Sequence, residues 1–192
     1  MGTVKIIINY INYVENRSKT NGGKKMLHKI AQKLDQHIHV EAVDAHCDIP
    51  CGIYDPHHAL IGALTVIRMV DLMTKLYEDH GEDLTPEVLN SMARYIAVKE
   101  EHAELTKHEI RIIWGDFIKE QHVESYPQLT GLVHKIMQLG SKARQTVDRE
   151  TSLALLSAVN EFAEIFWQIK GIETKRVKAP FPVAEEMVLP IL

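Results

Sequence analysis

Residues 46–73 read HCDIPCGIYDPHHALIGALTVIRMVDLM, and this stretch starts the fold. Asp55 and Pro56 form a helix start signal, an N-cap residue followed by a first-turn proline. Apolar residues then recur three or four positions apart, the period of an amphipathic helix. The sequence therefore predicts a helix over about 57–79 that stops near Gly81. Its buried stripe consists of Leu60, Leu64, Ile67, Val70 and Met73.

Three further helices are predicted downstream from similar signals. Thr85-Pro86 opens a helix over about 86–117. Ser125-Tyr126-Pro127 opens another over about 126–140, which Gly140 ends, and a last helix covers about 146–170. Four amphipathic helices with short links predict an all-α fold, an antiparallel up-and-down four-helix bundle. The candidate core residues of these three helices are Leu89, Met92, Ile96, Ile110, Ile113, Trp114, Phe117, Leu129, Leu132, Val133, Ile136, Met137, Leu153, Leu156, Val159, Phe162, Ile165, Phe166 and Ile169.

Both ends of the chain lie outside this predicted bundle of residues 57–170. Residues 1–45 carry seven Lys/Arg against four acids and form a separate leader. Residues 46–56 link that leader to the first helix. Residues 171–192 contain three prolines, which fit an extended arm over a neighbouring subunit and a disordered tail equally well.

Composition excludes several classes of function. The chain has a net charge of −4, and from His46 onward it carries 15 basic and 22 acidic residues, a net charge of −7. That balance argues against a nucleic-acid partner. No run approaches the roughly 18 uninterrupted apolar residues of a membrane span. Two cysteines argue against a disulfide-stapled secreted scaffold.

The two cysteines of the chain, Cys47 and Cys51, lie four positions apart directly after His46. Thiolates select soft or borderline metals, and a planar set of nitrogen and sulfur donors suits nickel(II) or copper(II) better than zinc. Taken alone, the pair also fits half of a tetrahedral zinc site, although no second pair with zinc-finger spacing exists. It fits a disulfide as well, which would close a very short loop and stabilise little.

The eleven residues 46–56 taken together resemble the nickel hook of nickel-containing superoxide dismutases, H-C-x-x-P-C-G-x-Y-x-P, at every defined position. We call these residues the hook. The resemblance continues through VKEEHAELTKHEIRIIWGDFIKEQHVESYP (98–127) and IFWQIK (165–170). It therefore covers residues 46–170 and implies superoxide dismutation at a nickel ion.

The resemblance also implies the metal ligands. Cys47 and Cys51 would supply sulfur, and Cys47 its deprotonated backbone nitrogen. His46 would supply its imidazole and a free terminal amine, so a protease would have to cleave after Ala45. Residues 1–45 would then be a pro-segment, of which 1–25 would be an upstream extension if Met26 is the natural start; an ordinary disordered leader is the alternative.

Further roles and partners follow from the same resemblance. Tyr54 and Asp48 resemble the residues that flank the vacant face of the metal, where they would gate access and help deliver protons. The alternative for Tyr54 is an anchor that packs the hook onto the first helix. Lys119 is a candidate for attracting the superoxide anion. The implied assembly is a homohexamer, and the expected compartment is the cytoplasm, or a plastid if the host is an alga.

The sequence departs from the family at two positions around the metal. A glutamate on the first helix and an arginine on the second orient the axial imidazole in the best-known members, but Gly62 and His102 stand there in this chain. Because such groups tune the orientation and basicity of ligands, these changes affect the tuning rather than the ligand set.

Two other readings of the residues remain open. Four-helix bundles also host di-iron sites, but Glu101, Glu104 and His108 lack the Glu-x-x-His spacing and fit a solvated face. The main alternative to the enzyme is a non-enzymatic helical module in which the Cys47/Cys51 pair is a disulfide or a metal-storage hook.

Overall fold

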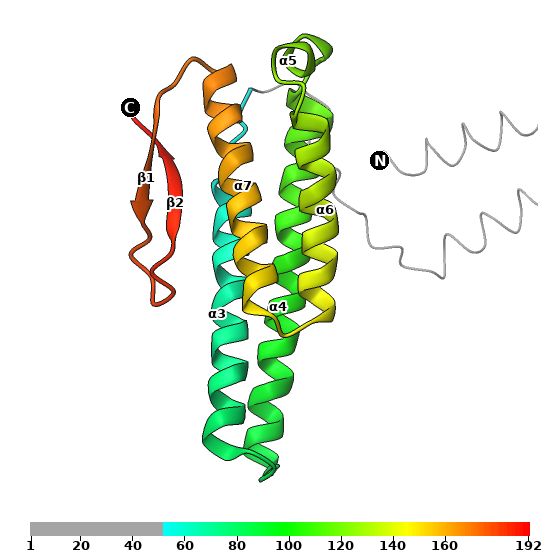
Figure 1. Cartoon of the computed structure of the whole chain (residues 1–192), viewed down its shortest axis with the longest axis vertical. Coiled ribbons are helices and arrows are strands. Elements are labelled where there is room, and N and C mark those ends of the chain that lie inside the picture. Colours follow the sequence, from blue (N-terminus) through cyan, green and yellow to red (C-terminus); the bar gives the residue numbers. More distant parts are fainter. Residues whose placement is uncertain (1–51) are drawn as a thin grey trace, which may run out of the picture. The chain divides into compact units, whose positions relative to one another are not determined.

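The computed structural model describes residues 52–192, and four long helices form an antiparallel bundle within them (Figure 1). α3 packs against α4 and α7, while α6 packs against α4 and α7. This arrangement confirms the predicted four-helix bundle. None of the helices in the described residues is both long enough and apolar enough to cross a membrane. The helices are α3 (His57–His80), α4 (Pro86–Ile112), α6 (Leu129–Gln145) and α7 (Arg149–Ile169).

α3 and α4 begin where the sequence predicts, whereas α6 and α7 begin at Leu129 and Arg149, three residues later than predicted. The Asp55 carboxylate accepts a hydrogen bond of 2.8 Å from the backbone N–H of His57. The Thr85 hydroxyl oxygen accepts one of 3.4 Å from the N–H of Val88, with Pro86 in the first turn of α4. Such caps satisfy backbone donors that have no partner inside the helix.

The end of α4 differs from the prediction. The predicted helix over 86–117 is α-helical only to Ile112, and a π-helical turn, η1 (Ile113–Phe117), completes it. In this turn the N–H of Ile118 donates to the carbonyl of Ile113 at 3.0 Å. A short helix that was not predicted, α5 (Glu120–Ser125), follows. A π turn adds a residue to the helical repeat, and nothing in the apolar spacing indicates it.

The prediction that Gly140 ends the third helix is wrong, because α6 continues to Gln145. Gly140 is buried, and a Cβ atom there would lie 2.7 Å from Cγ of Lys107. The glycine therefore permits close packing of α6 on α4 and does not act as a cap. The carbonyl groups at the end of α6 receive hydrogen bonds from buried Lys99 instead. Its ammonium donates to the carbonyls of Ala143, Arg144 and Thr146, each at 2.7 Å.

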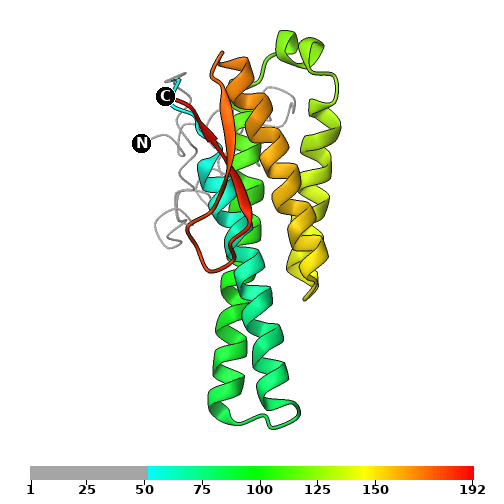
Figure 2. The same ribbon diagram turned by 60° about the vertical axis from the view of Figure 1, so that its left-hand side comes forward.

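The core lies where the four helices run together. All five residues of the predicted stripe on α3 are buried, and Phe162 and Phe166 of α7 are the largest fully buried side chains. The prediction that Leu89 and Ile96 belong to the core is wrong for the single chain, because both are exposed. Both residues belong to the first half of α4, and α3 and α4 project beyond the ends of α6 and α7 (Figure 2).

The C-terminal residues form neither an extended arm nor a disordered tail. Strands β1 (Thr174–Lys178) and β2 (Glu186–Pro190) pair as an antiparallel hairpin, with Val177 opposite Met187. The hairpin lies along the bundle (Figure 2). Buried Asn160 of α7 holds β2: its amide donates to the carbonyl of Glu186 at 2.9 Å and accepts from the N–H of Val188 at 2.8 Å.

The buried ammonium of Lys99 gives a test of the bundle. Replacement by methionine keeps the bulk of the side chain but leaves three carbonyls without their donor. We expect Lys99→Met to lower the free energy of unfolding by about 3 kcal/mol, because hydrogen bonds to charged groups are among the stronger ones. The measurement is urea denaturation of the full chain. Lys142→Met, at an exposed lysine in the last turn of α6, is the control and should change stability little. An equal loss in both variants would contradict this account.

Candidate metal centre

The predicted metal ligands His46, Cys47 and Cys51, and the predicted catalytic residue Asp48, lie outside the described residues. Of the predicted site, the structure places Gly52 and Tyr54. Gly52 has a φ angle of +73°, in the left-handed region that favours glycine. The residue directly after Cys51 thus has a backbone conformation that other residues rarely adopt, and Tyr54 lies two residues after Gly52.

Tyr54 is an anchor of the hook on the bundle. Its side chain is only 8% exposed. Its ring lies 5.7 Å from that of Phe117, measured between ring centroids, in a tilted arrangement. Such a pair is worth about 0.5–1.5 kcal/mol beyond the area it buries. The anchoring role expected as the alternative for Tyr54 is therefore present; its predicted catalytic role stays a prediction.

Phe117 belongs to a larger aromatic cluster at this end of the bundle. Its ring lies 4.9 Å from that of Phe166, which in turn lies 5.0 Å from that of Trp167 in an edge-to-face contact. His122 of α5 stacks on Phe117 at 5.7 Å. Because Phe117 is the last residue of η1, the π turn determines where Tyr54 can rest. The sequence alone predicts buried aromatic residues here but not this order of contacts.

Two lysines lie near this cluster. The ammonium of Lys170 is 5.8, 5.2 and 5.6 Å from the ring centroids of Phe117, Phe166 and Trp167. Such cation–π contacts are worth about 0.5–1 kcal/mol at exposed sites. Lys119, the residue predicted to attract superoxide, is exposed and donates to the carbonyl of Asp116 at 2.8 Å. The sequence analysis did not single out Lys170, whose position depends on the packing of α7 against η1.

Within residues 52–192, no three His, Cys, Asp or Glu side chains gather where they could hold one metal ion. His57 and His58 are both exposed, and His58 lies 3.9 Å from Glu109. A centre with three or more such ligands therefore needs residues before Gly52. The two thiols and the imidazole of residues 46–51 are a donor set that fits nickel(II).

Gly62 and His102, the two departures from the family, lie at a close contact between α3 and α4. A Cβ atom at Gly62 would lie 2.5 Å from Oγ1 of Thr106 and 3.0 Å from the carbonyl oxygen of His102. No larger side chain fits at position 62 without moving α3 away from α4. Nδ1 of His102 is 2.9 Å from the carbonyl oxygen of Val98. In this chain Gly62 sets the spacing between α3 and α4, against Thr106 and the backbone carbonyl of His102.

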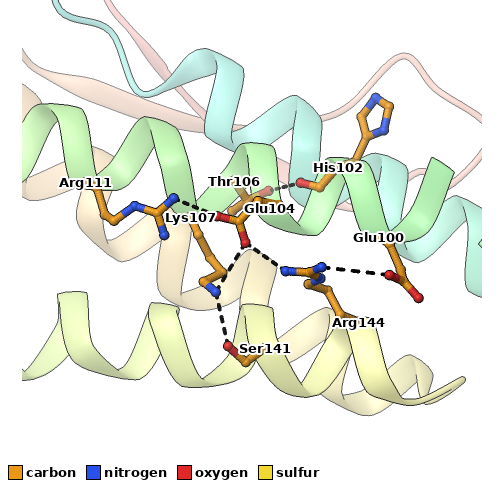
Figure 3. A network of polar contacts seen from close by, with 8 residues as sticks. All are labelled: Glu100, His102, Glu104, Thr106, Lys107, Arg111, Ser141 and Arg144. Atoms are coloured by element: carbon orange, nitrogen blue, oxygen red, sulfur yellow. Dashed lines mark hydrogen bonds and ion pairs between the residues drawn. The ribbon is translucent and has the colours of Figure 1, made fainter. Parts of the chain in front are cut away.

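Glu104 holds α4 and α6 together beside this contact (Figure 3). Its carboxylate accepts from Arg111 at 2.6 Å and from Arg144 at 3.0 Å, and lies 3.3 Å from the ammonium of Lys107. Burial alone would raise the pKa of Glu104, but the hydrogen bonds from Arg111 and Lys107 outweigh it and lower the pKa. The imidazole of His102 points away from this network (Figure 3). Glu104 thus has a structural role, and the network is not a metal site.

These features define a class of protein: a four-helix bundle in which a buried tyrosine closely follows a segment with two cysteines and a histidine, and whose described residues form no cluster of metal ligands. Comparison with known proteins gives the family. The model of the nickel-containing superoxide dismutase family matches residues 41–170. The chain belongs to this family, and its predicted resemblance to it is confirmed.

Named relatives agree with this assignment. The chain is 36% identical over 128 residues to the nickel superoxide dismutase of Streptomyces seoulensis, a match that covers 67% of this chain and 90% of that protein. It is 34% identical to the corresponding enzyme of Streptomyces coelicolor, with the same coverage. These comparisons favour the enzyme over the non-enzymatic module.

Solved structures are similar in fold as well. A crystal structure of a nickel-containing superoxide dismutase with nickel ligation of the oxidised state has a TM-score of 0.58 and 35% identity, over 66% of this chain and 99% of that chain. The apo structure of such an enzyme has a TM-score of 0.55 and 31% identity, over 62% and 99% of the two chains. The hairpin at 174–190 lies beyond the residues that the family model matches.

The contact at Gly62 can be tested directly. Gly62→Ala places a methyl group against Thr106 and the His102 carbonyl, and we expect a loss of about 1–3 kcal/mol in unfolding free energy from overpacking. Gly131→Ala is the matched control, because a Cβ atom at this glycine of α6 meets nothing within 4 Å. It should be stabilising by about 0.5–1 kcal/mol through the higher helix propensity of alanine. Thermal unfolding of both variants and of the parent chain measures these changes in stability. A Gly62→Ala chain as stable as the parent would disprove the close contact.

Proposed function

We propose that this chain, once its N-terminus is His46, disproportionates superoxide at a nickel ion held by residues 46–51. In the overall reaction two superoxide anions and two protons give one dioxygen and one hydrogen peroxide. The observation that carries the proposal is the position of the donor set. Both cysteines and His46 lie just before Gly52, whose φ angle is positive, and before Tyr54, which is buried against the bundle.

The chemistry of nickel explains why each proposed ligand is needed. Nickel, when bound, supplies one-electron chemistry by alternating between its +2 and +3 states, and thiolate ligands lower its potential into the required range. Cys47 and Cys51 would provide these thiolates. His46 would provide its imidazole and, as the first residue, a terminal amine. An amine is a good donor as it stands, whereas the peptide nitrogen between Ala45 and His46 would first have to lose its proton.

Tyr54 and Asp48 are proposed to act beside the metal. The buried ring of Tyr54 fixes its hydroxyl group relative to the bundle, three residues after Cys51. A fixed hydroxyl can hold a water molecule, limit the size of what enters and pass on a proton, and Asp48 can pass on the second. Positioned proton donors typically contribute about 100-fold or more to a rate.

Local positive charge is proposed to draw superoxide towards the hook. The net charge of −7 from His46 onward opposes long-range attraction of an anion. Lys170 lies over the ring of Phe117, on which Tyr54 rests, and Lys119 lies two residues after Phe117. These two ammonium groups therefore provide positive charge beside the anchored end of the hook.

The surroundings of the reaction follow from the same chemistry. A maturation protease that cleaves after Ala45 is required to generate the terminal amine.

We place the protein in the cytoplasm, because thiolate ligands must stay reduced and reducing compartments preserve them. We also propose a homo-oligomer, with a hexamer as the assembly that the family resemblance implies.

The first test concerns the terminal amine and the thiolates. The chain beginning at His46 should bind nickel and dismutate superoxide, while the full chain with the same nickel should show negligible activity. Cys47→Ser and Cys51→Ser should each abolish tight nickel binding, measured by metal analysis after dialysis. Equal activity of the full and shortened chains would refute the requirement for cleavage, and nickel retained by both serine variants would refute the ligand set.

The second test separates the two roles of Tyr54. Tyr54→Phe keeps a ring on Phe117, so the free energy of unfolding should change by less than about 1 kcal/mol, while activity per bound nickel should fall about 100-fold if the hydroxyl passes on protons. Tyr126→Phe is the control, because Tyr126 is a partly buried tyrosine packed against the core. Pulse radiolysis gives the rates. Full activity in Tyr54→Phe would leave Tyr54 as an anchor only.

A further inference from the structure

A pocket opens between α3 and the turn of the C-terminal hairpin, and we call it the hairpin pocket. The turn lies beside α3 in both views of the chain (Figure 1, Figure 2). α3 contributes Ile61, Leu64, Thr65 and Arg68 to the wall, and the turn contributes residues 181–183. The volume is about 290 Å³, at the lower end of the roughly 300–1,000 Å³ of small-molecule sites. The pocket therefore has the size for a small ligand.

The wall of this pocket is mostly apolar and contains one cation, Arg68. Leu64 and Val183 are buried, and Phe181 is 40% exposed. The hydroxyl of Thr65 donates to the carbonyl of Ile61 at 2.8 Å, so its proton is not available to a ligand. Apolar walls with a single charged donor fit a molecule that has an apolar body and one anionic group.

Arg68 has no anionic partner among the described residues. Asp71, one turn further along α3, accepts instead from Arg149 at 2.9 Å. Glu185, at the end of the hairpin turn, accepts from the same Arg149 at 2.8 Å. A guanidinium group carries five N–H donors in a planar arrangement that matches the two oxygens of a carboxylate. Arg68 thus offers an unused carboxylate-binding group beside an apolar wall.

Contacts within the chain hold the turn in place, so the pocket is formed in the absence of a ligand. The two ion pairs of Arg149 join α3 to the hairpin. Pro180 and Pro182 restrict the backbone of the turn. Ala184 has a φ angle of +55°, and its N–H donates to the carbonyl of Phe181 at 2.9 Å. An alanine keeps this unfavourable conformation only where its surroundings impose it. A wall that is already ordered lowers the cost of binding.

We propose that the hairpin pocket binds a small monocarboxylate with an apolar tail, of the class of medium-chain carboxylic acids. The carboxylate pairs with Arg68, and the tail lies against Leu64, Phe181 and Val183. The turn lies beyond residues 41–170, which the family model matches, so the pocket is not part of the fold that this model describes. The inference is independent of nickel and of the proposed dismutation.

The experiment titrates the full chain with octanoate and follows the methyl groups of isoleucine, leucine and valine by NMR. The methyl signals of Ile61, Leu64 and Val183 should shift. Those of Leu89 on α4, which is not part of the wall, should stay in place. Butanoate has a shorter tail and should bind at least ten-fold more weakly, because each buried methylene group strengthens binding by up to about four-fold.

Arg68→Gln tests the carboxylate contact. It should weaken octanoate binding about ten-fold, because hydrogen bonds to charged groups are among the stronger ones. It should leave the affinity for 1-octanol, which has the same tail but no charge, unchanged. Arg94→Gln is the matched control: Arg94 is an exposed arginine of α4 that lies outside the wall and makes no ion pair with a described residue. Its affinity for octanoate should equal that of the parent.

Phe181→Ala tests the apolar wall. Because it removes one side of the pocket, it should weaken octanoate and 1-octanol alike. Absence of methyl shifts at the pocket, or equal octanoate affinity in Arg68→Gln and the parent, would overturn the proposal. An equal loss of octanoate binding in Arg68→Gln and Arg94→Gln would overturn it as well. None of these results depends on dismutase activity.

Discussion

The contact between Tyr54 and Phe117 is the constraint on which the proposed position of the metal centre depends. Within residues 52–192 no three His, Cys, Asp or Glu side chains could hold a metal ion, and the clearest contribution of the bundle is to hold Tyr54 in place. This buried ring lies three residues after Cys51, and Gly52, with its positive φ angle, lies in between. In the proposed centre the bundle would fix one end of a short segment, and the ligands of that segment would meet around an ion. Binding free energy would then contribute to ordering the segment, as in other small metal sites.

This division of labour explains why the fold and the ligand set were predictable from different kinds of signal. The apolar period and the side-chain hydrogen bonds of Asp55 and Thr85 depend on neighbouring residues only, so the four helices follow from the sequence. The ligands were predicted from a residue pattern, and the structure of residues 52–192 does not test them.

The predictions that were wrong concern features that contacts between distant residues determine. Gly140 looks like a helix end but serves close packing against Lys107, and α6 ends instead at carbonyls that Lys99 binds from 44 or more residues away. The π turn that positions Phe117 leaves no trace in the apolar spacing. The C-terminal hairpin depends on Asn160, a polar residue inside an otherwise apolar helix face. Leu89 and Ile96 have core spacing because spacing reports which way a side chain faces, and not whether anything covers it.

The Gly62 contact shows how a family member can change the surroundings of its metal and keep its bundle. With glycine there, α3 and α4 approach until Thr106 and the His102 carbonyl fill the space that a side chain would need. A glutamate at position 62 could therefore not be accommodated here without moving the two helices apart. The hook would remain responsible for ligation and the bundle for anchoring, which is the central claim of this account.

The most direct measurement of that claim is the nickel K-edge X-ray absorption spectrum of the chain that begins at His46. The account predicts two sulfur atoms and nitrogen in the first coordination shell of nickel, and one sulfur fewer in a chain with a single cysteine. A first shell of nitrogen and oxygen alone would contradict it, because the metal would then be held by residues other than the two thiolates of the hook.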